Sequence, residues 1–452
     1  MEQIVANQRR YFNSNTTKPL DFRIEQLEKL KTILKTNEQA LEEAVNLDYG
    51  KSKFETSLTE MYLVFDEINS SLENLREWAK PKAVPGQGLT AGAECYIMPE
   101  PLGVSLVIGP WNYPYQLALA PLVAAISAGC TAILKPSELT PHSSGLIAKL
   151  LNENFAPEYL KVVEGGIPET TELLAQKFDT IFFTGSVPVG KIVYQAAAKN
   201  LTPVTLELGG KSPSIFMPDC DLDVSVRRLV WGKFLNGGQT CIAPDYALVH
   251  KDIAPQFLEK VAETIRASDY KTENGNFVKI VNERNTSRIA ALIDPEKVFL
   301  GGGVDIEKRL IEPTVLTNVN WEDKVMQEEI FGPLLPVLTF ENLDDAILEV
   351  KERPKPLALY LFSEDEAVKQ KVLSEISFGG GCVNDAILHI SNGSLPFGGV
   401  GDSGIGRYHG EEGFRAFSHY KSIVETPTAT DPAIRYSPYT DEKIALIKSL
   451  AP

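Results

Sequence analysis

Cys241 is the residue whose surroundings most favour chemistry. It lies in the segment FLNGGQTCIAPDY, with a Gly–Gly pair before it and Ala–Pro after it. Most free cysteines are buried, small and inert. Small and turn-forming neighbours instead favour a strained, open loop, and a partly accessible thiol that is helped to ionise can act as a nucleophile. The segment therefore leaves two interpretations of Cys241, a packing residue or a nucleophile.

Two further polar side chains could complete such a site. Glu207 lies inside the apolar run VTLELGG, and burial there would raise its pKa toward the range of a general base. Asn112 follows an apolar run, in IGPWNYP, and its side-chain amide is a neutral donor suited to an oxyanion. The alternatives are a strand-edge glutamate that faces water and a turn asparagine.

Two turns have residues that suit a dinucleotide. In FFTGSVPVG an apolar run leads into Gly185 and Ser186, with Gly190 beyond, and a glycine turn that opens a helix presents free backbone N–H groups to a phosphate. In AILKPSE, Lys135 ends an apolar run and Glu138 follows, a pair that suits ribose hydroxyls. The spacing GxxxxG is not the usual GxGxxG, so a tight βα turn and a solvated Lys–Glu pair remain alternatives.

The elements around these residues indicate an α/β fold. Up to about residue 80, apolar residues at Ile24, Leu27, Leu30 and Leu34 have helical spacing. From there to about residue 210, short apolar runs alternate with helical stretches. This βαβ rhythm predicts a parallel, doubly wound sheet, and its repetition further along predicts a second α/β domain.

Length and composition exclude several function classes. A chain of 452 residues is long enough for two or three domains. Its net charge of −16 argues against a nucleic-acid partner and against an electrostatic membrane anchor. We find no secretory signal and no run of about 20 apolar residues, so we expect a cytoplasmic protein with no transmembrane segment. Five cysteines and five histidines do not cluster at metal-ligand spacings, so we expect no metal.

Taken together, these motifs resemble the aldehyde dehydrogenase superfamily. The resemblance rests on PWNYP, LKPSE, FTGSVPVG, LELGGKSP, GQTCIAPDY, EEIFGPLLPV and LPFGGVGDSGIGRYHG, which follow one another in the family's order. The short N-terminus and CIAPDY resemble the class 3 branch, whose members act on medium- and long-chain or aromatic aldehydes. One departure lies at the pyrophosphate turn, where the family often has GSTxxG: here Val187 replaces the threonine and Pro188 follows.

The resemblance implies a role for each candidate residue. Cys241 would be the nucleophile, Glu207 the general base and Asn112 the oxyanion donor. The residues expected at the dinucleotide site are Trp111, Lys135, Glu138, Gly185, Ser186, Gly190, Leu208, Gly209, Glu329 and Phe331. The residues expected to line the substrate tunnel are Tyr113, Leu117 and Phe397. The implied cofactor is NAD, with NADP also accepted, because Glu138 would face the adenosine ribose and repel a 2′-phosphate.

The resemblance also implies a domain arrangement. We expect a Rossmann-like dinucleotide-binding domain over residues 1–207, in which a hairpin at 94–103 forms an oligomerisation arm. A catalytic domain would span residues 208–396. The C-terminal segment, 397–452, would return to the cofactor domain and to the interface of a homodimer.

The expected reaction is oxidation of an apolar aldehyde to its carboxylic acid, through a thiohemiacetal and a thioester on Cys241. Three alternatives remain. A CoA-acylating dehydrogenase would use the same cysteine and would be expected to dispense with the base at Glu207. A cysteine hydrolase would need a histidine partner, and His250 is the nearest in sequence. A binding protein without activity would not require the Cys–Glu–Asn set.

Overall fold

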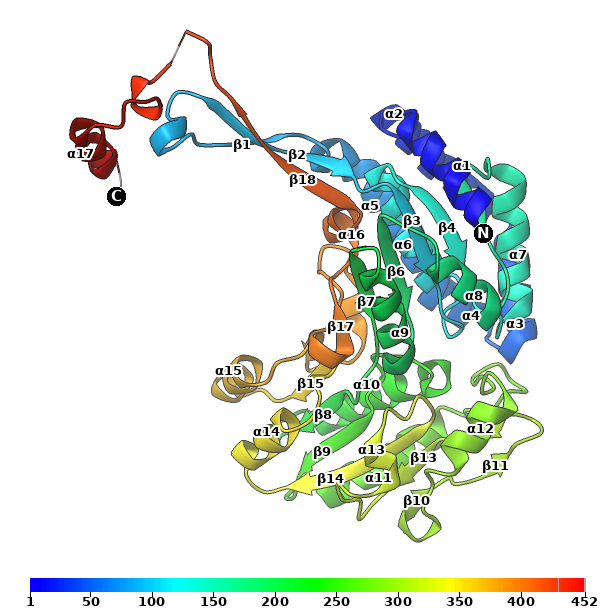
Figure 1. Ribbon diagram of the computed structural model, residues 1–452. Helices are drawn as coiled ribbons and strands as arrows, with labels where there is room; N and C mark the ends of the chain where they lie inside the picture. The colour runs from blue at the N-terminus through cyan, green and yellow to red at the C-terminus, as the bar shows by residue number, and fades with distance from the viewer. Residues whose placement is uncertain (430, 451–452) are drawn as a thin grey trace.

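Helices α1 to α5 precede the first strand and lie along one side of the molecule (Figure 1). The structure is a computed structural model that describes residues 1–429 and 431–450. The helices are α1 (Glu2–Asn13), α2 (Leu20–Thr36), α3 (Glu38–Tyr49), α4 (Lys53–Thr56) and α5 (Tyr62–Trp78), with a π-helical turn, η1 (Ser57–Met61), before α5. Leu27, Leu30 and Leu34 are buried on one face of α2. The helical prediction for this region is confirmed.

The first large sheet has the strand order β17-β7-β6-β3-β4-β5. Its strands are β3 (Val104–Ile108), β4 (Thr131–Lys135), β5 (Leu160–Val162), β6 (Thr180–Thr184), β7 (Val204–Glu207) and β17 (Gly404–Ile405). Strands β3 to β7 are parallel, whereas β17 pairs antiparallel with β7. The strand order reverses between β3 and β6, and ligands bind at such a point beyond the carboxyl ends of the strands. The predicted doubly wound parallel sheet is confirmed.

The second large sheet has the order β10-β13-β14-β9-β8-β15-β16 and lies below the first in Figure 1. Its strands are β8 (Pro213–Phe216), β9 (Tyr246–His250), β10 (Val298–Leu300), β13 (Thr314–Leu316), β14 (Leu334–Phe340), β15 (Ala358–Phe362) and β16 (Gly380–Val383). All neighbours are parallel except β10 and β13. A short hairpin of β11 (Val304–Asp305) and β12 (Leu310–Ile311) stands apart from it. This sheet confirms the expected second α/β unit.

Helices connect the parallel strands in both sheets. Those of the first sheet are α6 (Gln116–Ala128), α7 (Pro141–Asn154), α8 (Ile167–Leu174) and α9 (Val187–Ala198). Those of the second are α10 (Leu222–Phe234), α11 (Ala254–Ala267), α12 (Glu283–Ala290), α13 (Lys324–Gln327), α14 (Leu343–Lys351) and α15 (Glu366–Glu375). Short 3₁₀ turns are η2 (Gly88–Thr90), η3 (Leu235–Gly238), η4 (Pro295–Lys297), η5 (Leu388–Ser391), η6 (Gly401–Ser403) and η7 (Ala433–Arg435).

A third, three-stranded sheet forms an arm that projects from the body, with α17 (Asp441–Leu450) at its far end (Figure 1). Its strands are β1 (Lys82–Val84), β2 (Glu94–Pro101) and β18 (Ser418–Glu425), with β2 in the centre. Residues 94–103 therefore contain one strand, and the expected hairpin within them is wrong. The turn lies earlier, between β1 and β2, and the second partner, β18, follows α16 (Gly410–Ala416) near the end of the chain.

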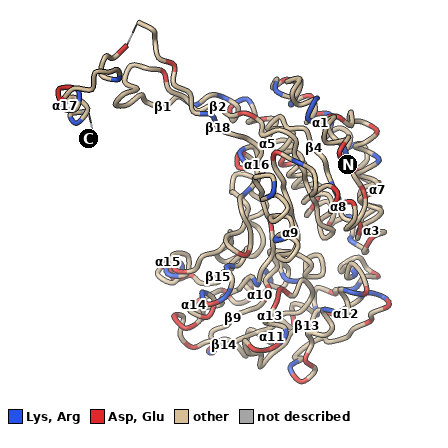
Figure 2. The backbone as a smooth tube through the Cα atoms, viewed as in Figure 1, with Lys and Arg blue, Asp and Glu red and all other residues tan. Residues whose placement is uncertain are grey.

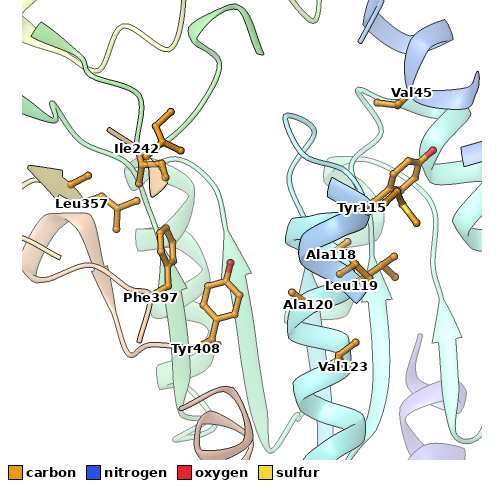
Figure 3. Packing of buried hydrophobic residues seen from close by; sticks show 14 of the residues in the cluster. Val45, Tyr115, Ala118, Leu119, Ala120, Val123, Ile242, Leu357, Phe397 and Tyr408 are labelled. Carbon is orange, nitrogen blue, oxygen red and sulfur yellow. The ribbon is translucent and has the colours of Figure 1, made fainter. Parts of the chain in front are cut away.

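The main hydrophobic core takes in residues of both large sheets and of α6, which packs on β3 and β4 of the first sheet. Every residue of α6 is buried, as expected for a helix that is apolar all round. The same cluster takes in Val45 from α3, Ile242 from the loop after Cys241, and Phe397 and Tyr408 from the C-terminal segment (Figure 3). The Phe397 and Tyr408 rings meet edge to face, with centroids 5.8 Å apart. The C-terminal segment thus shares a core cluster with Ile242 of the cysteine loop, packs against β6 through Tyr408 and Phe182, and pairs with β7 through β17.

Basic and acidic residues are interspersed along the chain, with positions of both signs in each part of the molecule (Figure 2). Within residues 1–429 and 431–450, no helix combines the length and the apolar character needed to cross a membrane.

Candidate active site

Cys241 lies on a tight loop that follows α10. The three residues Asn236, Gly237 and Gly238 all have left-handed backbone conformations, with φ of 52°, 61° and 74°. A side chain at Gly238 would place its Cβ 2.3 Å from the carbonyl oxygen of Gly332, so only glycine fits this close approach. The expected strained loop is present, and it leaves Cys241 partly buried.

Hydrogen bonds from three directions hold this loop in place. The Tyr113 hydroxyl lies 2.7 Å from the Thr240 hydroxyl. The Tyr360 hydroxyl donates to the carbonyl oxygen of Ile242 at 2.5 Å. The Gln239 amide donates to the Asn236 carbonyl at 3.0 Å and accepts from the backbone N–H of Val281 at 3.0 Å. The sequence did not indicate that Tyr360 and Gln239 support this loop, because neither side chain is reactive and the atoms that they bond to belong to the main chain.

Asn112 is buried just after β3 and points its side chain at the cysteine loop. Its amide donates one hydrogen to the carbonyl oxygen of Gln239 at 3.0 Å. A primary amide has two hydrogens to donate, so one remains for an oxygen next to Cys241. The structure therefore brings the Asn112 side chain and the cysteine loop together.

Glu207 ends β7 in an environment without polar partners. The residue is buried, and neither carboxylate oxygen has a hydrogen-bond partner in the part of the chain that the structure describes. Burial raises its pKa well above the usual value of a carboxyl group. A carboxyl in this state can hold a proton near neutral pH and take one from water when it is ionised.

The thiol of Cys241 is also held in its neutral form. Burial raises the pKa of this thiol, and the charges of Glu329 and then Glu207 raise it further. Both carboxylates therefore act on the sulfur through space. A nucleophilic cysteine usually has help in ionising; here backbone hydrogen bonds at Cys241 and Ile242 lower the thiol pKa, but they are outweighed by burial and by the two carboxylates.

The turn predicted to bind the pyrophosphate connects a strand to a helix. β6 leads into Gly185, and Ser186 caps α9, which begins at Val187. A Cβ at Gly190 would lie 2.6 Å from Leu208 Cδ2, so glycine lets the helix pack closely on β7. The Val–Pro pair occupies the first turn of α9, where Pro188 removes one N–H from the anion-binding end of the helix.

Lys135 and Glu138 form a pair at the end of β4. The ammonium group of Lys135 is buried and donates to the carbonyl oxygens of Pro136 and Gly165 at 2.7 and 2.6 Å, and to Glu138 Oε2 at 3.3 Å. Burial lowers the pKa of Lys135. The Glu138 side chain is 46% exposed. The pair is thus anchored at the lysine and open to a ligand at the glutamate.

The remaining cofactor candidates gather around Gly209. A Cβ there would lie 2.2 Å from Glu329 Oε2, so this carboxyl group rests directly on the Gly209 backbone. Burial, with the charge of Asp245, raises the pKa of Glu329 to about 8. The Phe331 ring meets the Trp111 ring edge on, with centroids 5.4 Å apart.

An ion pair between Lys211 and Asp245 holds the segment that carries Glu329. Their closest N–O distance is 2.5 Å. Lys211 also donates to the carbonyl oxygens of Val325 and Glu328, and Asp245 accepts from the N–H of Ile330 at 3.0 Å. The two residues lie in the motifs LELGGKSP and GQTCIAPDY. The sequence analysis did not single out Lys211 or Asp245, although their opposite charges within these motifs could have suggested an ion pair.

The predicted tunnel residues Tyr113, Leu117 and Phe397 are all buried. Phe397 stacks between the rings of His389 and His409, with centroid distances of 5.9 and 5.4 Å. A small cavity beside α6 is lined by Leu63, Asp66, Glu67, Gln116, Ala120, Ile390, Gly393 and His409. A larger cavity, of about 420 Å³, lies between the α12 and α13 regions and has no predicted site residue in its lining.

The only Cys–His contact among the described hydrogen bonds involves a different cysteine. Cys382 Sγ lies 3.6 Å from His389 Nδ1. His250 instead bonds to the carbonyl oxygen of Glu341 at 3.1 Å. The cysteine-hydrolase alternative, which needs a histidine partner for Cys241, gains no support from these contacts.

Comparisons with known proteins agree with this geometry. Residues 1–423 match the model of the aldehyde dehydrogenase family. The chain is 45% identical to 4,4′-diaponeurosporen-aldehyde dehydrogenase of Staphylococcus aureus, over 97% of this chain and 96% of that protein. It is 44% identical to the dimeric NADP-preferring aldehyde dehydrogenase of Canis lupus familiaris, over 97% and 98%.

A solved structure, the substrate-bound state of Staphylococcus aureus AldH, superposes with a TM-score of 0.96 at 44% identity, over 99% of this chain and 98% of that one. An NAD⁺ complex of betaine aldehyde dehydrogenase from the same organism superposes with a TM-score of 0.86 at 26% identity, over 96% and 89%. The chain therefore belongs to the aldehyde dehydrogenase family and is an enzyme that oxidises aldehydes with NAD or NADP.

Proposed function

We propose that Cys241 attacks the aldehyde carbon, that Asn112 stabilises the resulting oxyanion and that Glu207 activates the water that releases the acid. The observation that carries this proposal is the convergence of three groups at the cysteine loop. Asn112 is hydrogen-bonded to that loop, and Glu207 is buried, has no polar partner within residues 1–429 and 431–450, and raises the pKa of the Cys241 thiol.

Acylation begins when the Cys241 sulfur bonds to the carbonyl carbon and the π electrons move to oxygen. The free hydrogen of the Asn112 amide is placed to bond to that oxygen, and losing one such donor costs about 3 kcal/mol or more in transition-state stabilisation. The carbon then loses hydride and becomes a thioester.

The residues around the crevice suit a nicotinamide dinucleotide. The Gly185 turn and the first turn of α9 offer backbone N–H groups to the pyrophosphate. We expect Glu138, which is 46% exposed beside the buried Lys135, to accept from ribose hydroxyls of the cofactor. Glu329, with Oε1 buried and unpartnered among the described residues, is left with an acceptor for a ribose hydroxyl. When bound, the oxidised nicotinamide supplies the hydride acceptor and a positive charge.

Deacylation requires a base, and Glu207 suits that role. Its ionised carboxylate takes a proton from water, and the hydroxide equivalent attacks the thioester carbon. The C–S bond breaks, the acid leaves and the sulfur is regenerated. Burial raises the pKa of Glu207, which makes it a stronger base once it is ionised and suits it to activate water.

We infer an apolar aldehyde as substrate. Tyr113, Leu117 and Phe397 form buried, mainly apolar surfaces near the cysteine loop, and one relative is named for 4,4′-diaponeurosporen-aldehyde. We also propose a homodimer that forms through the arm. Apolar residues are exposed there, Val424 at 51% and Tyr439 at 79%, and one relative is named as dimeric. A cytoplasmic location stays a prediction from composition.

A substrate panel tests the proposal. Aldehydes graded in chain length and aromaticity, including 4,4′-diaponeurosporen-aldehyde, are mixed with enzyme and NAD⁺ or NADP⁺, with and without CoA, and nicotinamide reduction is followed by absorbance. We expect kcat/KM to rise with apolar surface and CoA to have no effect. Turnover that requires CoA would contradict hydrolysis through Glu207, and a preference for short polar aldehydes would contradict the substrate class.

A further inference from the structure

The backbone carbonyl of Asn112 is held by side chains from the N-terminal helical region. Its oxygen accepts from the Tyr49 hydroxyl at 2.8 Å, from Asn236 Nδ2 at 2.9 Å and from Lys51 Nζ at 3.3 Å. Lys51 and Tyr49 are fully buried. The residue proposed to bind the oxyanion is therefore fixed at its main chain by these donors and at its side chain by the bond to Gln239.

Lys51 forms a buried ion pair with Glu60. The Nζ–Oε1 distance is 2.8 Å, and both side chains are 0% exposed. The Glu60 Oε2 atom accepts from the backbone N–H groups of Tyr115 at 2.7 Å and Gln116 at 3.4 Å. The Lys51 ammonium also lies 4.1 Å from the centroid of the Tyr113 ring. The pair thus contacts four of the five residues from 112 to 116, which we call the oxyanion loop.

The same network reaches the nucleophile loop, defined as residues 236–241. Asn236 Nδ2 donates both to the Asn112 carbonyl and, at 3.2 Å, to the Gln239 carbonyl. Gln239 accepts in turn from the Asn112 side chain. The backbone N–H of Asn236 donates to Glu55 Oε1 at 2.7 Å. A shift of the oxyanion loop would therefore break bonds to the loop that carries Cys241.

We propose that Lys51 and Glu60, together with Tyr49, are positioning residues that fix the oxyanion loop against the nucleophile loop. A buried ion pair adds little net stability, because the desolvation of two charges offsets their attraction. The pair does fix an orientation, since Lys51 Nζ contacts the Asn112 carbonyl and the Tyr113 ring while Glu60 Oε2 accepts from the backbone of the oxyanion loop. Misplacement of a reacting group by about 1 Å can cost about a hundredfold in rate. This inference rests on the proposed roles of Cys241 and Asn112.

The test is the double variant Lys51→Met/Glu60→Gln, which removes both charges and keeps an oxygen able to accept from Tyr115. We expect kcat for aldehyde oxidation to fall about tenfold to a hundredfold. Hydrolysis of p-nitrophenyl acetate without cofactor, which needs the thiol, the oxyanion donor and the deacylation base but no hydride transfer, should fall equally. The dissociation constant of NAD⁺ should stay within about twofold, because neither residue contacts the predicted dinucleotide site. Rates within about twofold of wild type in the folded double variant would overturn the proposal.

A cycle with Asn112→Ala separates positioning from a general loss of stability. If the pair acts through Asn112, adding Lys51→Met/Glu60→Gln to Asn112→Ala should cost less than about threefold more, because effects on one contact are not additive. Losses that multiply in full would overturn the inference. The matched control is Lys53→Met/Glu42→Gln, which removes an ion pair of 3.0 Å between α3 and α4, and we expect wild-type rates there.

A milder variant covers the case in which the double variant fails to fold. Tyr49→Phe removes one donor to the Asn112 carbonyl, and we expect ester hydrolysis to fall several-fold, with the same non-additivity toward Asn112→Ala. An unchanged rate in Tyr49→Phe would overturn the inference. A wild-type enzyme that oxidised no aldehyde would instead overturn the proposed function, so the two failures are distinguishable.

Discussion

At the scale of single residues, the carboxyl groups around Cys241 oppose the ion that the reaction needs. Burial raises the pKa of the thiol, and Glu329 contributes more to that rise than Glu207 does. The enzyme without cofactor therefore keeps its nucleophile neutral and slow to react. A bound oxidised nicotinamide adds a positive charge, which favours the thiolate. We therefore expect the sulfur to react faster when the hydride acceptor is in place than when it is absent.

Removal of the Glu329 charge should expose this effect. At pH 9, above the pKa of about 8 of Glu329, that carboxyl is ionised and raises the pKa of the thiol. Glu329→Gln should therefore lower the thiol pKa and speed alkylation of Cys241 by iodoacetamide, and in both proteins the rate should rise with pH as thiolate forms. Glu328→Gln, at the adjacent position, is the control. Peptide mass spectrometry gives the alkylation rate at Cys241. An unchanged rate in Glu329→Gln would show that the Glu329 carboxylate does not raise the thiol pKa.

Glu138 should govern the choice of cofactor. Its side chain is half-exposed at the end of β4, where a carboxylate accepts from ribose hydroxyls and repels a 2′-phosphate. Buried Lys135 beside it partly offsets that repulsion. We expect NAD⁺ to be preferred and NADP⁺ accepted, with the NADP⁺/NAD⁺ ratio of kcat/KM rising in Glu138→Gln. Steady-state kinetics with both cofactors measure this ratio, and equal ratios in the two proteins would show that Glu138 does not face the 2′ position.

At the scale of elements, the contact between α9 and β7 sets the shape of the pyrophosphate turn. Gly190→Ala would bring a Cβ to 2.6 Å from Leu208 and push the helix outward. Overpacking of this kind costs about 1–3 kcal/mol in the free energy of unfolding. We also expect the dissociation constant of NAD⁺, measured by calorimetry, to rise about tenfold or more, since the N–H groups of α9 move with the helix.

Gly145→Ala is the matched control for this change. Gly145 lies inside α7, and a Cβ there would meet only Glu164 Oε1 at 3.5 Å, an ordinary contact. Alanine should stabilise this helix by up to about 1 kcal/mol and leave NAD⁺ binding unchanged. Equal effects of the two substitutions on NAD⁺ binding would contradict the role given to Gly190.

The elements that were predictable from sequence are those with strong local patterns. Buried parallel strands are continuous apolar runs, so β3, β4 and β6 could be recognised together with the turns that end them. β17 could not, because it is two residues long in a glycine-rich segment and is defined only by its pairing with Glu207 and Leu206. The misplaced hairpin has a similar cause: the long partner of β2 is β18, which lies over 300 residues away.

The site could be predicted only in part for the same reason. Sequence motifs identify Cys241, Asn112 and Glu207 as candidate site residues. Lys51 and Glu60 lie in a helical region whose sequence looks like an ordinary charged surface. Their function depends on burial against the oxyanion loop, which local sequence does not encode.

At the scale of the whole molecule, the arm gives the chain a surface that its own body does not cover. β18 pairs with β2 from Ser418–Pro101 to Glu425–Glu94, and its Val424 side chain remains 51% exposed. Long exposed strands tend to pair with another chain. The proposed homodimer would cover this surface and tie the C-terminal segment, which shares a core cluster with Ile242 of the cysteine loop, to the partner.

A charge at Val424 should weaken that dimer. We expect sedimentation equilibrium to give twice the chain mass for the wild type and a shift toward the single-chain mass for Val424→Lys. Leu348→Lys, at a residue with similar exposure on α14, should remain dimeric. A wild type of single-chain mass would refute the dimer, and an intact dimer in Val424→Lys would place the interface elsewhere.

The central claim is that the acyl group passes through Cys241 and leaves with the help of Glu207. The most direct test is to mix Glu207→Gln with an apolar aldehyde and NAD⁺, quench the reaction and determine the intact mass and the modified peptide. Because Gln keeps the shape and removes the base, we expect about one reduced nicotinamide per site and one acyl group on Cys241, with neither in Glu207→Gln/Cys241→Ser. Sustained fast turnover of Glu207→Gln, or an acyl group on Cys95, Cys130, Cys220 or Cys382 instead, would contradict the mechanism.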